Sequence, residues 1–117
     1  NDIGVEGASA LAAVLKETRI THLDLTKNAL CGVSEFGRGT YTTEGITKLC
    51  EGLKGSCVTS LSLWKNNLGP EGGAALAEGL RGNSTLQLLK IAANDIGAKG
   101  AAALAAILKE TQIQELN

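Results

Sequence analysis

Residues 59–80 first alternate apolar and polar side chains and then space their leucines by one helical turn. Leu61 and Leu63 lie two positions apart, which places them on one face of a strand. Leu76 and Leu80 lie four positions apart, which places them on one face of a helix. One strand and one helix cannot bury their apolar faces by themselves, so the pattern predicts that this unit packs against copies of itself.

The same spacing of apolar residues occurs three times in full, and each copy ends at an asparagine. A helical pattern with a glycine and two leucines follows each copy, as in Gly72, Leu76 and Leu80. The three frames are Ile20-x-x-Leu23-x-Leu25-x-x-Asn28, Val58-x-x-Leu61-x-Leu63-x-x-Asn66 and Leu86-x-x-Leu89-x-Ile91-x-x-Asn94.

The distance between successive asparagines is 27 or 28 residues except at one place. Asn1 and Asn28 are 27 positions apart and Asn66 and Asn94 are 28 apart, whereas Asn28 and Asn66 are 38 apart. The extra residues fall within 31–41, between a strand and its helix. We therefore interpret all 117 residues as a single repeat array, with about three full repeats, partial repeats at both ends and one insertion.

The frame L-x-x-L-x-L-x-x-N-x-L with one helix per copy resembles the leucine-rich repeat. The spacing of 27 or 28 residues and the I/L-G-x-x-G-A-x-x-L-A-x-x-L helices resemble the ribonuclease-inhibitor subclass, as in NOD-like receptors and the Ran GTPase-activating protein. The resemblance implies an α/β leucine-rich repeat solenoid, with a curved parallel sheet on the concave side and helices on the convex side. It implies little about function, because unrelated proteins share the scaffold.

The composition of the chain argues against nucleic acid and membranes as partners. Eleven basic and twelve acidic residues give a net charge of −1, which offers no electrostatic case for nucleic acid or for a membrane surface. No apolar run is long enough to span a bilayer. The three cysteines, Cys31, Cys50 and Cys57, follow no repeated spacing, which favours reduced thiols and an intracellular, cytoplasmic setting.

The recurring asparagines Asn28, Asn66 and Asn94 are interpreted as framework. A buried amide can satisfy backbone groups of a turn that a parallel sheet leaves unpaired. This structural asparagine ladder therefore carries no prediction about function.

Side chains that alternate away from the core are the first candidate binding surface. Trp64 is central among them, and exposed aromatic side chains are enriched among interface hot spots. The alternative is that Trp64 packs on neighbouring strand residues or on the inserted loop. The predicted protein-binding residues of this surface are His22, Asp24, Trp64, Lys65, Leu88 and Lys90, and Glu115 is expected to begin the next row.

The insertion at 31–41 is the second candidate, because loops on a rigid scaffold often carry function. Phe36, Arg38 and Tyr41 are its predicted contact residues. The alternative is a length variant that a repeat array tolerates at little cost. A further hypothesis follows from the family resemblance: Arg38, between two glycines, would act on a bound GTPase like the arginine of a GTPase-activating protein.

Catalysis has little support in the sequence, and we predict a non-enzymatic protein with no cofactor and no metal. His22 and Asp24 share one strand face, but no serine or cysteine has an evident base partner. No spacing of cysteine or histidine matches a metal site.

The prediction for function is a non-catalytic recognition or scaffold segment of a longer repeat protein, which binds another protein. The alternative within binding is a structural subunit or linker in a large assembly. Because repeat arrays need caps, we expect flanking repeats or neighbouring subunits to cover both ends. The residues expected to be open are Ile3, Val5, Leu11 and Leu15 at one end and Ile113 and Leu116 at the other.

Overall fold

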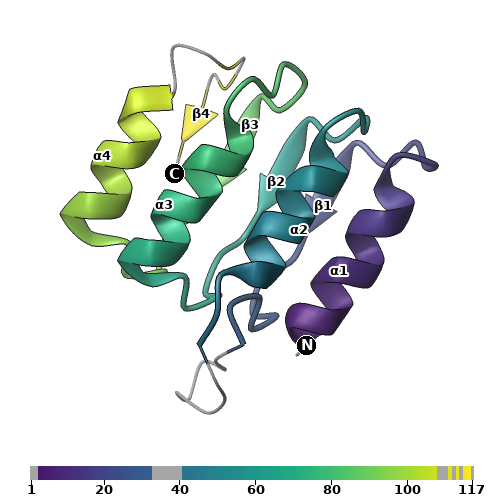
Figure 1. The fold of residues 1–117 in the computed structure, drawn as a ribbon. Coiled ribbons are helices and arrows are strands. Elements are labelled where there is room, and N and C mark those ends of the chain that lie inside the picture. Colours follow the sequence, from purple (N-terminus) through teal and green to yellow (C-terminus); the bar gives the residue numbers. More distant parts are fainter. Residues whose placement is uncertain (1–2, 33–40, 108–110, 112, 114, 117) are drawn as a thin grey trace.

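The computed structural model describes residues 3–32, 41–107, 111, 113 and 115–116. Helices and short strands alternate along the chain, so the fold is α/β (Figure 1). The elements in order are α1 (Gly4–Leu15), β1 (His22–Asp24), α2 (Glu44–Leu53), β2 (Ser60–Ser62), α3 (Gly69–Leu80), β3 (Leu88–Lys90), α4 (Gly97–Ile107) and β4 (Glu115–Leu116).

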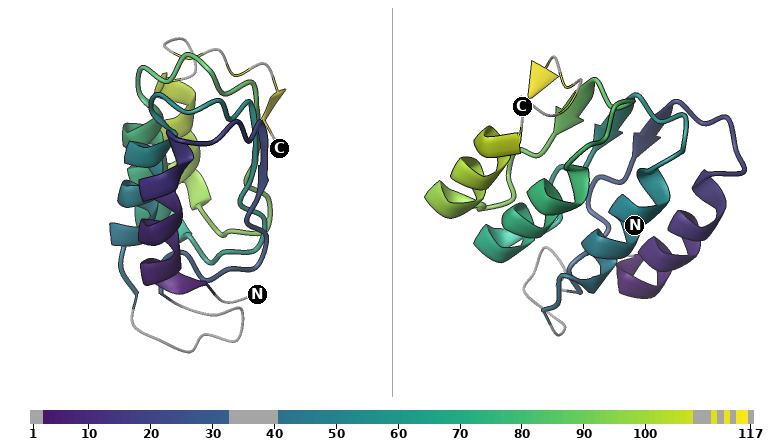
Figure 2. Two further views of the ribbon diagram at one scale, coloured as in Figure 1. Left: turned by 90° about the vertical axis from the view of Figure 1, so that its right-hand side faces the viewer. Right: turned by 45° about the horizontal axis from the view of Figure 1, so that its top comes forward.

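The four strands form one parallel sheet in the order β1-β2-β3-β4, and α2, α3 and α4 each carry the chain back between neighbouring strands. The helices lie side by side on one face of this sheet, and no described element covers the other face (Figure 2). The molecule measures 34 × 32 × 18 Å, and the short dimension corresponds to one helix layer on one sheet layer. We call the uncovered side the open sheet face.

Leucines fill the space between the two layers, as the repeat pattern predicts. Leu61, Leu63, Leu76 and Leu80 are each 0% exposed. Leu23 lies at the sheet edge on β1 and is only partly buried, because no described strand pairs on its outer side.

The expectation for the first end of the array is wrong for Leu15. This side chain is 1% exposed, because the last turn of α1 directs it into the leucine core. The residues at 3, 5, 11 and 113 are half-buried, and the side chain of Leu116 lies outside the described part.

Glycines in the helices allow the helix layer to pack closely. A Cβ at Gly52 would overlap the backbone of Ala12, so α2 approaches α1 at that point with no space for a side chain. A Cβ at Gly79 would overlap Cys50, which places α3 equally close to α2. Gly52 and Gly79 are therefore required for close packing between neighbouring helices.

The asparagines form a continuous hydrogen-bonded series at the ends of the strands. The Asn66 side-chain oxygen accepts hydrogen bonds from the backbone N–H groups of Asn28 (3.0 Å) and Leu30 (3.2 Å) in the preceding repeat. The Asn66 amide donates to the carbonyl oxygens of Leu25 (2.8 Å) and Leu63 (3.0 Å). Each asparagine therefore closes its own turn and attaches it to the previous one.

The turns around these asparagines require an unusual backbone. The residue on either side of each asparagine has positive φ although none of them is glycine, which costs conformational energy that the surrounding hydrogen bonds offset. These residues are Lys27 (57°), Ala29 (53°), Lys65 (57°), Asn67 (53°), Ala93 (60°) and Asp95 (50°).

Candidate protein-interaction surface

The strand register arranges the outward side chains of the open sheet face in rows. His22, Ser60 and Leu88 are paired across β1, β2 and β3, and Glu115 on β4 continues this row. The side chain of Glu115 lies outside the described part of the structure. The second row is Asp24, Ser62 and Lys90.

The parallel pairing continues one step beyond the strands and so adds a third row. The backbone N–H of Lys27 donates to the carbonyl oxygen of Trp64 (2.9 Å), and that of Lys65 donates to the carbonyl oxygen of Ala92 (3.4 Å). Thr26, Trp64 and Ala92 therefore follow the second row across the sheet.

Asp24 is held in place by Thr26. The Asp24 carboxylate accepts hydrogen bonds from the Thr26 hydroxyl (2.6 Å) and the Thr26 backbone N–H (3.0 Å). The Thr26 hydroxyl also lies 3.1 Å from the Ser62 hydroxyl on the next strand. The Thr26 side-chain and backbone hydrogen bonds lower the pKa of Asp24, and the positive charge of Lys90 adds to this effect. Asp24 therefore presents a fixed, ionised carboxylate.

Trp64 lies between the core and solvent, with 39% of its surface exposed. The Lys65 ammonium nitrogen lies 4.6 Å from the centroid of the Trp64 ring, which is a cation–π distance. The left-handed backbone of Lys65 allows this neighbour to turn back over the ring, since adjacent residues of a regular strand point to opposite faces.

A shallow trough runs along β2 between the side chains of β1 and β3. One depression of about 320 Å³ is lined by Asp24, Thr26, Ser62, Trp64 and Lys90. A second, of about 230 Å³, continues from it and is lined by His22, Leu23, Asp24, Ser60, Ser62 and Lys90. The two serines are small compared with their neighbours, so they lie at the bottom of the trough, and Trp64 closes one end.

His22 does not form a catalytic pair with Asp24. Its ring nitrogen Nδ1 lies 3.0 Å from the Thr21 hydroxyl, while the hydrogen bonds of Asp24 come from Thr26. Within the described ranges, no group of three or more His, Cys, Asp or Glu residues could hold a metal ion. In the same ranges, no helix has the length and apolar character needed to cross a membrane.

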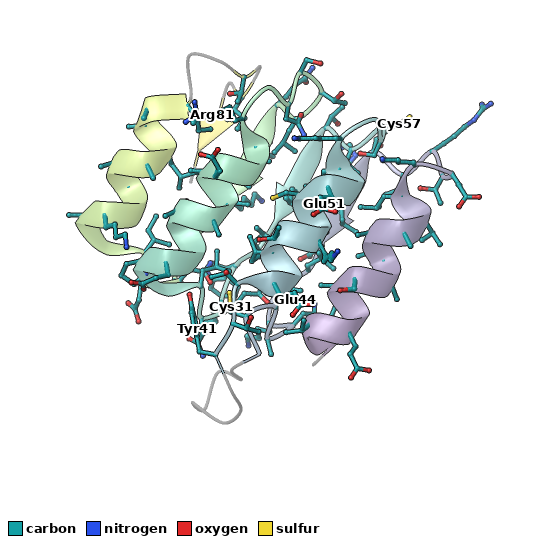
Figure 3. The ribbon with its side chains drawn as sticks, in the orientation of Figure 1. Cys31, Tyr41, Glu44, Glu51, Cys57 and Arg81 are labelled. Atoms are coloured by element: carbon teal, nitrogen blue, oxygen red, sulfur yellow. The ribbon has the colours of Figure 1, made fainter. Side chains whose placement is uncertain are left out.

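Tyr41 lies at the far end of the insertion and contacts the following repeat. Its hydroxyl donates a hydrogen bond to the carbonyl oxygen of Leu68, just before α3 begins. Burial raises the pKa of Tyr41 to about 12, and the nearby Cys31 thiol contributes. Figure 3 shows Cys31 and Tyr41 close together at this end of the helix layer. Phe36 and Arg38 lie outside the described residues, so Tyr41 is the part of this second candidate that can be located.

The structure adds two relationships that the sequence analysis did not name. Thr26 restrains Asp24, and Lys65 lies over Trp64 rather than beside it. The first could have been found, because Asp24 and Thr26 are two positions apart on one strand face. The second could not, because nothing in a strand pattern indicates a left-handed residue at Lys65.

Comparison with known families supports one class of protein. A family model described as "Leucine Rich repeat" matches residues 1–12, 56–77 and 82–105. With the repeated strand, asparagine turn and helix, these matches support a leucine-rich repeat protein. Such domains generally mediate protein–protein interactions, and their repeats are typically not catalytic. No curated protein matches the chain.

Proposed function

We propose that this chain is a recognition segment of a ribonuclease-inhibitor-like leucine-rich repeat solenoid, which binds another protein through the open sheet face. The spacing of 27 or 28 residues and a complete α-helix in each repeat support this subclass. The contact surface is centred on Trp64, with His22, Asp24, Lys65, Leu88 and Lys90 around it.

The observation that carries the proposal is the exposure of Trp64 at the end of a trough. Its indole lies on the side of the sheet away from the leucine core, and 39% of it faces solvent. A large, rigid aromatic side chain next to a depression is the arrangement found at interface hot spots. Asp24 is fixed by Thr26, so part of the surface is preorganised and loses less entropy on binding.

Trp64→Ala tests the surface in the full chain, with Val14→Ala as the control. Val14 is 46% exposed on α1, in the helix layer, so it removes a comparable exposed apolar group from the other side of the molecule. For a partner copurified from the native source, we expect Trp64→Ala to weaken binding about 30-fold, since a hot spot contributes about 2 kcal/mol. Equal binding by both variants would mean that the partner does not bind at the open sheet face.

The same preparation separates recognition from a structural role. A structural subunit or linker would copurify in fixed stoichiometry and would not exchange with added free chain. A recognition segment would exchange, because its complex dissociates at a finite rate.

A further inference from the structure

Charge is distributed unevenly between the two layers. Acidic side chains of the described helices lie in the helix layer, and Figure 3 labels two of them, Glu44 and Glu51 on α2. Among the residues that line the trough, Asp24 is acidic and Lys90 is basic, and a second basic residue, Lys65, lies over the Trp64 ring at its end. Around Trp64, two basic side chains therefore lie near one acidic side chain, although the chain as a whole carries a net charge of −1.

Asp24 is already engaged by the protein itself. One carboxylate oxygen accepts two hydrogen bonds from Thr26, and the charge of Lys90 contributes to the low pKa of the group. Neither lysine makes an ion pair with a described residue, although Lys65 lies over the Trp64 ring and the charge of Lys90 acts on Asp24. The ion pairs that the described part contains, Arg81–Glu78 and Lys99–Glu71, lie in the helix layer.

The shape of the trough adds a second requirement. Its larger depression, about 320 Å³, has Ser62 at the bottom and the Trp64 ring as one wall. Small residues between longer ones leave room for a side chain inserted by a partner, and the Trp64 ring favours an apolar one. Lys65 and Lys90 lie beside this position, within the reach of residues next to the inserted side chain.

We propose that the open sheet face binds an acidic polypeptide segment in which an apolar side chain is flanked by aspartate or glutamate. The apolar side chain occupies the depression against Trp64, and the flanking carboxylates pair with Lys65 and Lys90. Charge complementarity selects this partner over a basic one, because a basic segment would meet two lysines. This inference rests on the proposed function and specifies the partner's chemistry.

The test uses the chain's single tryptophan as its reporter. Because Trp64 is the only one, its indole N–H gives one resonance in a nitrogen-15 spectrum, at the proposed site. Three blocked peptides serve as probes: Gly-Asp-Leu-Asp-Gly, Gly-Asn-Leu-Asn-Gly and Gly-Lys-Leu-Lys-Gly. We expect the acidic peptide to shift the Trp64 resonance at the lowest concentration and the basic peptide at the highest. Added salt should weaken binding of the acidic peptide more than binding of the other two, because salt screens its charges.

Charge variants refine the same titration. Lys90→Gln should weaken binding of the acidic peptide about two- to fivefold, as expected for one exposed ion pair. Asp24→Asn should leave its binding unchanged or tighter, because a repelling carboxylate is removed. Lys48→Gln, at an exposed lysine on α2, is the matched control and should have no effect.

The possible outcomes differ in what they overturn. Preference for the basic peptide, lost in Asp24→Asn, would overturn the acidic partner and leave the open sheet face as a binding surface. If a thymidine hexanucleotide binds more tightly than the acidic peptide, the ligand of this face is nucleic acid and the inference is wrong. If no peptide shifts Trp64, the inference is wrong, and the Trp64→Ala copurification decides separately whether the surface binds a protein.

Discussion

Asn66 and Asn94 are joined by a hydrogen bond of 2.7 Å from the Asn66 backbone N–H to the Asn94 side-chain oxygen. In the preceding repeat, the Asn28 backbone N–H donates the equivalent hydrogen bond to the Asn66 side-chain oxygen. This relationship couples each turn to the next, so the turns that support the third row of the open sheet face are not independent of one another.

Removing one amide from the series should therefore be costly. Asn66 is 1% exposed and its side chain bonds backbone groups in two repeats, so Asn66→Ala leaves several buried donors and acceptors without partners. We expect a loss of about 3 kcal/mol in the free energy of unfolding, measured with urea.

Asn28→Ala is the internal comparison, because its amide donates to Thr26 and accepts only a long bond of 3.4 Å from Ile3. We expect this variant to lose about 1 kcal/mol. Equal effects of the two substitutions would contradict the hydrogen-bond account of the ladder.

Much of the fold could be predicted because its determinants repeat. The spacing of Leu61, Leu63 and Asn66 recurs at Leu89, Ile91 and Asn94, and three copies with one period indicate strands, turns and helices without any long-range information. The order of strands in a parallel sheet follows from the same repetition.

The candidate surface could be predicted only in outline. Alternation gave the outward positions of Asp24 and Trp64, but the left-handed backbone at Lys65 depends on the turn that the Asn66 amide stabilises. The burial of Leu15 also required the structure, because the extent to which one partial repeat is covered depends on packing between layers.

Trp64→Ala should separate binding from folding. Since 39% of the side chain is exposed, truncation should cost about 1–2 kcal/mol of unfolding free energy, less than the ~3–5 kcal/mol typical of a fully buried tryptophan. Urea unfolding followed by circular dichroism measures this loss independently of the missing fluorophore. A loss as large as that of a core residue would assign Trp64 to the framework.

Gly52→Ala should destabilise the chain although alanine favours helix. By propensity alone the substitution would add up to about 1 kcal/mol of stability, although Gly52 lies in the last turn of α2. The new methyl group would overlap the backbone of Ala12 on α1, and overpacking of this kind costs about 1–3 kcal/mol. We therefore expect a net loss in thermal unfolding. Ala13→Gly, at an exposed position of α1, should show the propensity effect alone.

Alkaline pH should weaken the contact between Tyr41 and Leu68. The pKa of Tyr41 is raised from 10.0 to about 12, so the folded state holds its proton where the unfolded chain loses it. The stabilising contribution is therefore complete below pH 10 and is lost as pH rises towards 12. Tyr41 is the only tyrosine, so its ionisation can be followed directly by tyrosinate absorbance, with an expected midpoint near 12.

Tyr41→Phe tests the physical origin of that shift. The variant keeps the ring beside Cys31 but removes the hydroxyl that donates to Leu68, and we expect a loss of about 1 kcal/mol at neutral pH. Its unfolding free energy should also lose the part of the alkaline dependence that Tyr41 contributes. The part that remains comes from the Cys31 and Cys50 thiols, whose pKa values burial raises to about 11 and about 12. A wild-type midpoint near 10, with no stability difference between the two proteins, would mean that Tyr41 is not bonded to Leu68 and is free to take part in binding.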